Sequence, residues 1–173
     1  MKKTLRTILE TIRFVAVVLV IVVPVRAYVA QPFVVNGNSM SPTFENGQYL
    51  IIDELSYFLR EPKRGEVVVF RYPKNPKTFF IKRLIGLPGE TVIIKDNQVT
   101  IQNGAEIINI DDSYIKEQTL ADHTAVLGVG EYFVLGDNRD QSYDSRYWGA
   151  VPEKLLKGRV LVRLFPVNKI TMF

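Results

Sequence analysis

The chain has 173 residues, of which 47% are hydrophobic, enough for one globular domain with its own core and one targeting segment. It contains no cysteine and a single histidine, which excludes disulfides, thiolate metal sites and metal centres built from several histidines. The net charge of +4 comes mainly from residues 1–13, whereas a nucleic-acid-binding protein needs a basic patch on its folded part. We therefore expect no nucleic acid partner, no metal and no cofactor.

The first expected element is an apolar membrane anchor at residues 14–30. This segment has 17 residues, and as a helix it would be about 26 Å long, with the side chain of Arg26 reaching toward an interface. The basic residues before it predict that residues 1–13 stay in the cytoplasm and that residues 31–173 form an extracytoplasmic domain. A secretory signal peptide cleaved near residues 27–30 is the alternative, because length and charge do not separate the two.

Beyond the anchor the pattern is mainly β. Short runs rich in Val, Ile, Phe and Tyr alternate with Gly, Pro, Asn and Asp, which is typical of strands separated by turns. The expected strands are Tyr49–Ile52, Glu66–Tyr72, Thr78–Ile85, Thr91–Lys95, Val99–Gln102, Tyr132–Leu135 and Arg159–Phe165. Asp96 and Asn97 predict a tight hairpin turn. A short helix is expected after Val151, with Pro152 at its first position and Gly158 at its end.

Ser39 and Lys82 are the candidate catalytic pair. A serine hydroxyl needs a neighbouring base that takes its proton as it attacks. A lysine serves as that base only when neutral, so its pKa, ordinarily near ~10.4, must fall by several units, which burial among apolar side chains achieves. In a strand, the two-residue repeat places Phe80, Lys82 and Leu84 on one face, so that the lysine stands in an apolar row. The alternative is an edge-strand lysine whose ammonium reaches solvent.

The residues around Ser39 predict an exposed turn with a groove beside it. The sequence Asn-Gly-Asn at residues 36–38 precedes the serine, and its glycine allows the backbone dihedrals that a tight turn requires. Met40 and Pro42 are candidate walls of a substrate groove, although a core methionine and a strand-end proline explain them equally well.

Two further segments carry ionisable side chains. The only histidine, His123, lies in a polar stretch and is expected in a solvent-exposed loop rather than in a Ser/His/Asp triad. The segment 136–146 follows an apolar strand and is rich in Asp, Asn, Arg and Ser, so many polar groups must find partners at one corner of the fold. Calcium is an alternative for its carboxylates, disfavoured by the irregular ligand spacing and the interposed arginines.

Four segments together resemble the bacterial type I signal peptidases, a family that uses a Ser/Lys dyad. SMSPTF at 39–44 is similar to the family's nucleophile box, RGEVVVF at 64–70 to the strand that follows, KRLIGLPGE at 82–90 to the lysine box and GDNRDQSYDSR at 136–146 to the third signature. Their order and spacing agree as well. The resemblance implies a signal-peptidase-like antiparallel β catalytic domain with one N-terminal transmembrane helix, in which residues 103–130 are a variable insertion.

The resemblance also implies roles for individual residues. It makes Ser39 the nucleophile and Lys82 the general base. It makes Ser142 the hydroxyl that orients the lysine amine, and Asp144 with Arg146 a supporting ion pair.

Of the two hydrogen-bond donors that the implied oxyanion hole needs, only one can be assigned. The backbone amide of Ser39 would be one donor to the developing negative charge. Some family members supply the second donor from a serine two positions before the nucleophile, but this chain has Gly37 there, so the second donor stays open.

The implied function is a signal peptidase I, a membrane-bound serine endopeptidase of the bacterial plasma membrane that removes signal peptides from exported preproteins. Its partners would be the lipid bilayer and signal peptides with small residues at the first and third positions before the cut, bound as an added strand. Two alternatives remain open: a Ser/Lys peptidase with one dedicated partner substrate, and a non-catalytic anchored β module that binds extended peptides.

Overall fold

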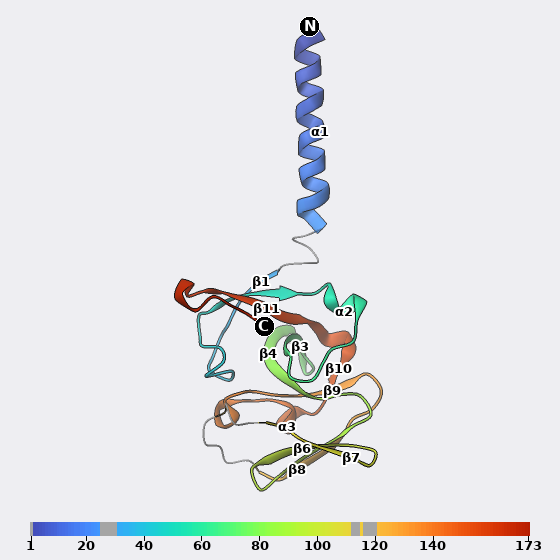
Figure 1. Ribbon diagram of the computed structural model, residues 1–173, viewed down its shortest axis with the longest axis vertical. Helices are drawn as coiled ribbons and strands as arrows, with labels where there is room; N and C mark the ends of the chain where they lie inside the picture. Colours follow the sequence, from blue (N-terminus) through green and yellow to red (C-terminus); the bar gives the residue numbers. More distant parts are fainter. Residues whose placement is uncertain (1, 25–30, 112–114, 116–120) are drawn as a thin grey trace.

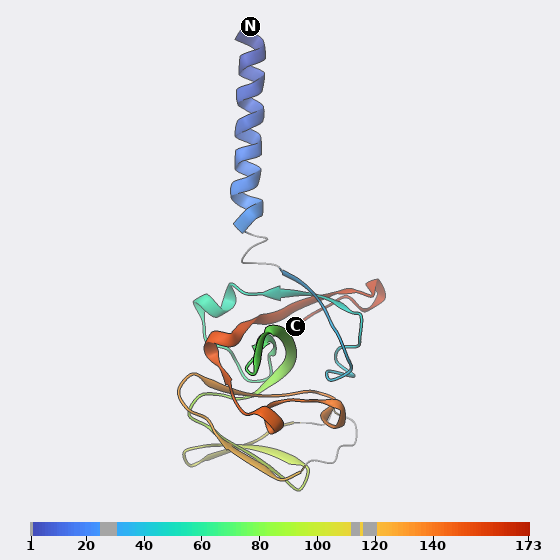
Figure 2. The same ribbon diagram turned by 180° about the vertical axis from the view of Figure 1, so that it is seen from behind.

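The computed structural model describes residues 2–24, 31–111, 115 and 121–173 and has a helix followed by a β-rich domain (Figure 1). Helix α1 spans Lys2–Pro24 and stands apart from the β domain in the front view and in the view from behind (Figure 2). None of the helices in the described part of the chain is long and apolar enough to cross a membrane. The spanning helix expected at residues 14–30 is therefore not found among the described residues. Residues 25–30 of the expected helix lie outside the described part.

Within the described residues the strands form two antiparallel sheets, so the expected mainly β, antiparallel fold is confirmed. The larger sheet has eight strands in the order β1-β2-β11-β3-β4-β9-β10, with β12 added to β11, and the smaller sheet has the order β7-β6-β5-β8. The larger sheet contains β1 (Gln31–Val34), β2 (Tyr49–Asp53), β3 (Val67–Tyr72), β4 (Asn75–Gly86), β9 (Glu131–Leu135), β10 (Val151–Pro152), β11 (Leu156–Phe165) and β12 (Thr171–Met172). The smaller sheet contains β5 (Thr91–Lys95), β6 (Gln98–Asn103), β7 (Glu106–Asn109) and β8 (His123–Val126).

Short helical turns join these strands. They are α2 (Ser56–Leu59), η2 (Arg139–Gln141), α3 (Ser145–Trp148), η3 (Glu153–Leu155) and η4 (Val167–Lys169). The loop between β1 and β2, residues 35–48, is called the nucleophile loop because the family resemblance assigns the nucleophile to its Ser39. The chain from β9 through η2 and α3 to β10 keeps the segment 136–146 against this loop, because the backbone amide of Asn138 donates to the carbonyl oxygen of Ser39 at 3.0 Å.

Strand β3 lies at the centre of the fold and is buried on both faces. Successive side chains of a strand point to opposite sides. Accordingly, Val67 and Val69 pack into the core cluster beneath the nucleophile loop, whereas Val68 and Phe70 pack into a second cluster with Leu84. A third cluster joins the smaller sheet to β4 and β9. Strand β4 pairs with β3, so its own orientation is set by this central packing.

Each of the seven strands expected from the sequence corresponds to an observed strand, and the hairpin at Asp96 and Asn97 is confirmed. Both residues have positive φ, 50° and 61°, and they join β5 to β6. The segment 103–130 is more regular than its sequence indicates, because it contributes β7 and β8, which pair with β6 and β5.

The helix expected after Val151 is wrong. Val151 pairs with β9 as part of β10, a single 3₁₀ turn follows, and β11 begins at Leu156 and continues through Gly158. Glycine at position 158 reflects a close approach of strands rather than a helix end, since an added Cβ would lie 2.5 Å from the carbonyl oxygen of Asp53. Pro152 and Gly158 thus belong to a strand–turn–strand segment and not to the start and end of a helix.

Candidate active site

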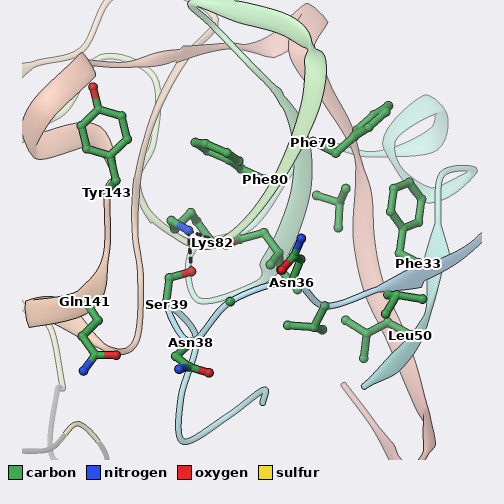
Figure 3. A pocket seen from close by; sticks show the side chains of 15 residues that line it. Phe33, Asn36, Asn38, Ser39, Leu50, Phe79, Phe80, Lys82, Gln141 and Tyr143 are labelled. Carbon is green, nitrogen blue, oxygen red and sulfur yellow. Dashed lines mark hydrogen bonds between the residues drawn. The ribbon is translucent and has the colours of Figure 1, made fainter. Parts of the chain in front are cut away.

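The structure brings Ser39 and Lys82 together across 43 positions of sequence. Ser39 lies in the loop after β1, and Lys82 lies in β4 opposite Val68 of β3. The Nζ atom of Lys82 is 2.7 Å from the Oγ atom of Ser39, and it also donates a hydrogen bond to the carbonyl oxygen of Ile81 at 3.0 Å (Figure 3). The two groups are therefore within the distance that a proton transfer requires.

The lysine amine sits in surroundings that favour its neutral form. Lys82 is only 5% exposed, and the ring centroid of Phe80 lies 5.4 Å from its Nζ atom. This burial lowers the pKa of Lys82 to about 8, although the carboxylates of Asp144 and Asp137 act in the opposite direction. An exposed edge-strand lysine is therefore excluded, and the lowered pKa raises the fraction of the amine that carries a free lone pair near neutral pH.

The nucleophile loop is fixed by its backbone. Gly37 has φ of +92°, in the left-handed region that favours glycine, and its amide donates to the side chain of Asn46 at 2.9 Å. The turn expected at residues 36–38 is thus present. On the far side of Ser39, Met40 and Phe44 are buried in the core, which ties the serine to the fold on both sides.

The segment 136–146 supports the site with two buried carboxylates. Asp144 is fully buried and accepts from Arg146 at 2.8 Å, and it also accepts from the backbone amide of Gly136 at 3.1 Å. Asp137 is 1% exposed and pairs with Arg83 at 2.6 Å. Because both carboxylates are engaged by guanidinium groups, they are not arranged as calcium ligands.

Sequence reasoning missed the role of Asp137. Its carboxylate accepts from Arg83, the residue beside Lys82, and from the hydroxyl of Thr43 at 2.6 Å, in the nucleophile loop. One side chain thereby connects the three segments that carry the site. In the sequence, the only sign of this role is Arg83, a second basic residue in β4 that must point away from Lys82. The sequence does not indicate which residue Arg83 binds.

The hydrogen bond expected from Ser142 to Lys82 is not formed in this structure. Ser142 is buried, and among the described residues its Oγ atom has no hydrogen-bond partner, because the lysine amine is turned toward Ser39 and Ile81. Ser142 nevertheless lies close to the nucleophile. A Cβ added to Gly136 would touch the Ser142 side chain on one side and the Ser39 carbonyl oxygen, at 2.5 Å, on the other.

A cleft of about 280 Å³ surrounds the dyad. Its walls come from β1 and the following loop, from β2, β3 and β4, and from the end of η2 and the residues after it (Figure 3). The lining residues are Phe33, Val34, Val35, Asn36, Gly37, Asn38, Ser39, Leu50, Val69, Phe79, Phe80, Ile81, Lys82, Gln141 and Tyr143. The two groove residues expected from the sequence do not line it. Met40 is 1% exposed inside the core, and Pro42 is exposed outside the cleft, since the chain turns away directly after Ser39.

His123 lies away from the cleft. It begins β8 in the smaller sheet and is partly buried, with its ring centroid 5.7 Å from that of Phe133. The expected solvent-exposed loop is therefore wrong in detail, because the residue belongs to a strand. Its position in the smaller sheet leaves Lys82 as the basic group beside Ser39.

A β domain that holds a serine hydroxyl against a buried lysine amine of lowered pKa defines a serine hydrolase of the Ser/Lys type. No metal or histidine is needed for this chemistry.

Comparisons with known proteins give the family. Residues 8–165 match the family model described as signal peptidase, peptidase S26. The chain is 39% identical over 170 residues to a probable signal peptidase I-2 of Synechocystis sp., with 95% of this chain and 76% of the relative covered. It is 36% identical over 173 residues to a signal peptidase I of Leptolyngbya laminosa, with 94% and 82% covered. A solved signal peptidase I of Enterococcus faecalis V583 is 36% identical, with a TM-score of 0.49 over 58% of this chain and 97% of that one. By the family model and the relatives, the chain belongs to the signal peptidase family, peptidase S26, and is a serine peptidase.

Proposed function

We propose that this protein removes signal peptides from exported preproteins, with Ser39 as nucleophile and Lys82 as general base. The observation that carries the proposal is the 2.7 Å contact between Ser39 Oγ and a lysine amine whose pKa is lowered to about 8 by burial. The test is cleavage of a purified preprotein by the full chain in detergent, with Ser39→Ala as control. A single cut after a small residue supports the proposal. Binding without cleavage would favour a non-catalytic peptide-binding module instead.

The reaction follows from the geometry of the dyad. The neutral amine of Lys82 accepts the hydroxyl proton of Ser39 as Oγ attacks the carbonyl carbon before the cut. The resulting ammonium gives this proton to the leaving amine when the peptide bond breaks, which leaves an ester on Ser39. Lys82, again neutral, then takes a proton from water as the water oxygen attacks the ester carbonyl. The Lys82 ammonium returns this proton to the Ser39 oxygen as the ester bond breaks, which releases the acid and restores both groups. The Ser39 amide is one donor to the oxyanion of each tetrahedral intermediate.

The strand edges beside the dyad suit an extended substrate. Among the described residues, β1 pairs only with β2, and residues 75–82 of β4 pair only with β3. Both edges border the cleft, so a peptide inserted between them can pair with these strands. We assign to this half of the cleft the residues before the cut, with small side chains at the first and third positions.

Supporting roles fall to the segment 136–146. The ion pair of Asp144 and Arg146 holds this segment in place, and Ser142 orients the amine once Lys82 leaves the carbonyl of Ile81 during catalysis. Gly37 has no side chain to donate, and its amide is engaged by Asn46, so the second oxyanion donor comes from elsewhere.

The activity should rise with pH through a midpoint near 8. Burial favours the neutral amine, so the fraction of Lys82 able to accept a proton grows as pH passes about 8 and is lost as pH falls below it. Phe80→Ala, which admits water beside the amine, should move the midpoint toward the ordinary lysine value near ~10.4. Profiles of kcat/KM against pH measure both. A wild-type midpoint near the ordinary value would exclude Lys82 as the base.

The location we propose is the bacterial plasma membrane. Residues 1–13 would be cytoplasmic, residues 14–30 a single transmembrane anchor and residues 31–173 an extracytoplasmic catalytic domain that includes the variable insertion at 103–130. The basic charge of residues 1–13 and the uncharged run after them support this arrangement. It would put Ser39 near the bilayer surface, where a translocating preprotein presents its cleavage site.

Protease protection tests the topology. In spheroplasts treated with an external protease, residues 132–165 should be degraded while residues 1–13 remain protected, because their basic charge keeps that end inside. The intact protein should also keep its original N-terminus when it is sequenced. A product beginning near residue 30 would establish a cleaved signal peptide and refute the anchor.

A further inference from the structure

The cleft continues past the dyad on the side opposite the free strand edges. Figure 3 shows Phe33, Leu50 and Phe79 on one side of the Ser39–Lys82 pair, and Gln141 and Tyr143 on the other. All of them line the same cleft. The cleft therefore offers a peptide cleaved at Ser39 a path beyond the dyad along the wall that carries Tyr143.

The direction of the substrate chain follows from the order of β1 and Ser39. Strand β1 starts directly after the proposed anchor, and it runs toward Ser39, so its first residue is the end nearest the membrane. The apolar part of a signal peptide lies in the membrane before the cut, so the substrate enters along β1 and passes Ser39 in the same direction. The residues after the cut consequently face Gln141 and Tyr143. This step rests on the proposed function.

Tyr143 presents an aromatic surface that is already held in place. Its side chain is 49% exposed, and its ring centroid lies 5.4 Å from that of Tyr147, which is 63% exposed. It also contacts Tyr72 with ring centroids 6.2 Å apart, and Tyr72 stacks on Phe80 at 4.7 Å. The ring therefore lines the cleft with part of its surface exposed, while its neighbours restrict its motion, an arrangement that binds a ligand at low entropic cost.

We propose that Tyr143, supported by Tyr147, binds the side chain of the first or second residue after the cut and favours an aromatic or large aliphatic side chain there. An exposed ring offers a planar apolar face, and contact with a second apolar group removes both from water. Glycine makes no such contact, and a carboxylate would lose hydration without gaining a partner. Tyr143 is thus a specificity-determining residue for the part of the preprotein that becomes the mature N-terminus.

The test uses synthetic peptides that differ only after the cut. Each carries alanine at the first and third positions before the cut, and Phe, Leu, Gly or Asp at the first or the second position after it. The wild-type protein in detergent should cleave the Phe and Leu peptides with kcat/KM about two- to tenfold above that of the Gly peptide at one of these positions. Tyr143→Ala should remove this preference, so that kcat/KM for the Phe and Leu peptides falls to that for the Gly peptide.

Control variants separate the ring from other effects. Tyr143→Phe keeps the ring and should keep the preference, whereas Tyr143→Leu should retain part of it. Tyr49→Ala removes a side chain of matching exposure, 50%, that contacts Phe165 outside the cleft, and it should change nothing. Thermal unfolding of each variant reports whether it folds.

Three results would overturn the inference: no preference in the wild type at either position, a preference that survives Tyr143→Ala, or an equal loss on all peptides. None of these outcomes touches the dyad, because Ser39→Ala tests the proposed function separately. If Tyr143→Ala does not fold, Tyr143→Phe and Tyr143→Leu decide the question. A stronger peptide preference in Tyr143→Phe than in Tyr143→Leu supports a contact with the ring, and equal preferences in the two variants refute it.

Discussion

Ser39→Ala and Lys82→Met should each reduce preprotein cleavage by about 10⁴-fold or more, and the double variant should lose no more than either single one. The non-additivity is expected because the hydroxyl and the amine, 2.7 Å apart, act as one unit in the proton transfer. Methionine suits the lysine site, since it fills the apolar surroundings without a charge, and alanine preserves the Ser39 carbonyl that accepts from Asn138. Steady-state kcat/KM and the thermal unfolding midpoint measure loss of chemistry and retention of fold.

His123→Ala is the matched control for this experiment. It removes the only histidine of the chain, which lies in β8 of the smaller sheet and does not line the cleft, so kcat/KM should stay within about threefold of the wild type. Chelators should leave the rate unchanged. A large loss in the His123 variant, or full activity of either dyad variant in a folded protein, would contradict the Ser/Lys mechanism.

The part of the fold that follows local rules could be predicted from the sequence. The alternation in β4 places Lys82 and Leu84 toward one interior and Ile81 toward another, and this pattern indicated a buried lysine, although it left an exposed edge-strand lysine open. The hairpin at Asp96 and Asn97 is equally local. Strand β1 was not expected from the sequence, because Gln31–Val34 has only four residues, one of them a proline, and directly follows the apolar run.

The part that depends on contacts distant in sequence could not be predicted. Asp137 joins Arg83 across 54 positions and Thr43 across 94, and no periodicity encodes such a pairing. The cleft walls were misassigned for the same reason. Met40 is adjacent to the nucleophile in sequence, but the chain folds it into the core, and Phe79, far from Ser39 in sequence, lines the cleft instead. Adjacency to a catalytic residue is thus a weak guide to a substrate contact.

Gly136→Ala should lower kcat/KM by about 100-fold, since displacing a reacting group by about 1 Å costs this much. An added Cβ would clash with the Ser142 side chain and lie 2.5 Å from the Ser39 carbonyl oxygen. The backbone of Gly136 cannot easily retreat, because its amide donates to Asp144 at 3.1 Å and its carbonyl accepts from Arg139 at 3.1 Å. The nucleophile loop must therefore move away from the segment 136–146 and carry Ser39 from its position beside Lys82.

The same variant should also be less stable, by about 1–3 kcal/mol, as expected when a methyl group is forced into a packed site. Gly128→Ala is the control, because the atoms nearest to its Cβ would belong to the side chain of Glu131, the first at 3.1 Å, and a side chain can turn aside more easily than backbone. This control should keep kcat/KM within about twofold of the wild type. Kinetics together with thermal unfolding distinguish the outcomes: a folded Gly136→Ala protein with wild-type kcat/KM would show that contact between segment 136–146 and the Ser39 loop does not position the nucleophile.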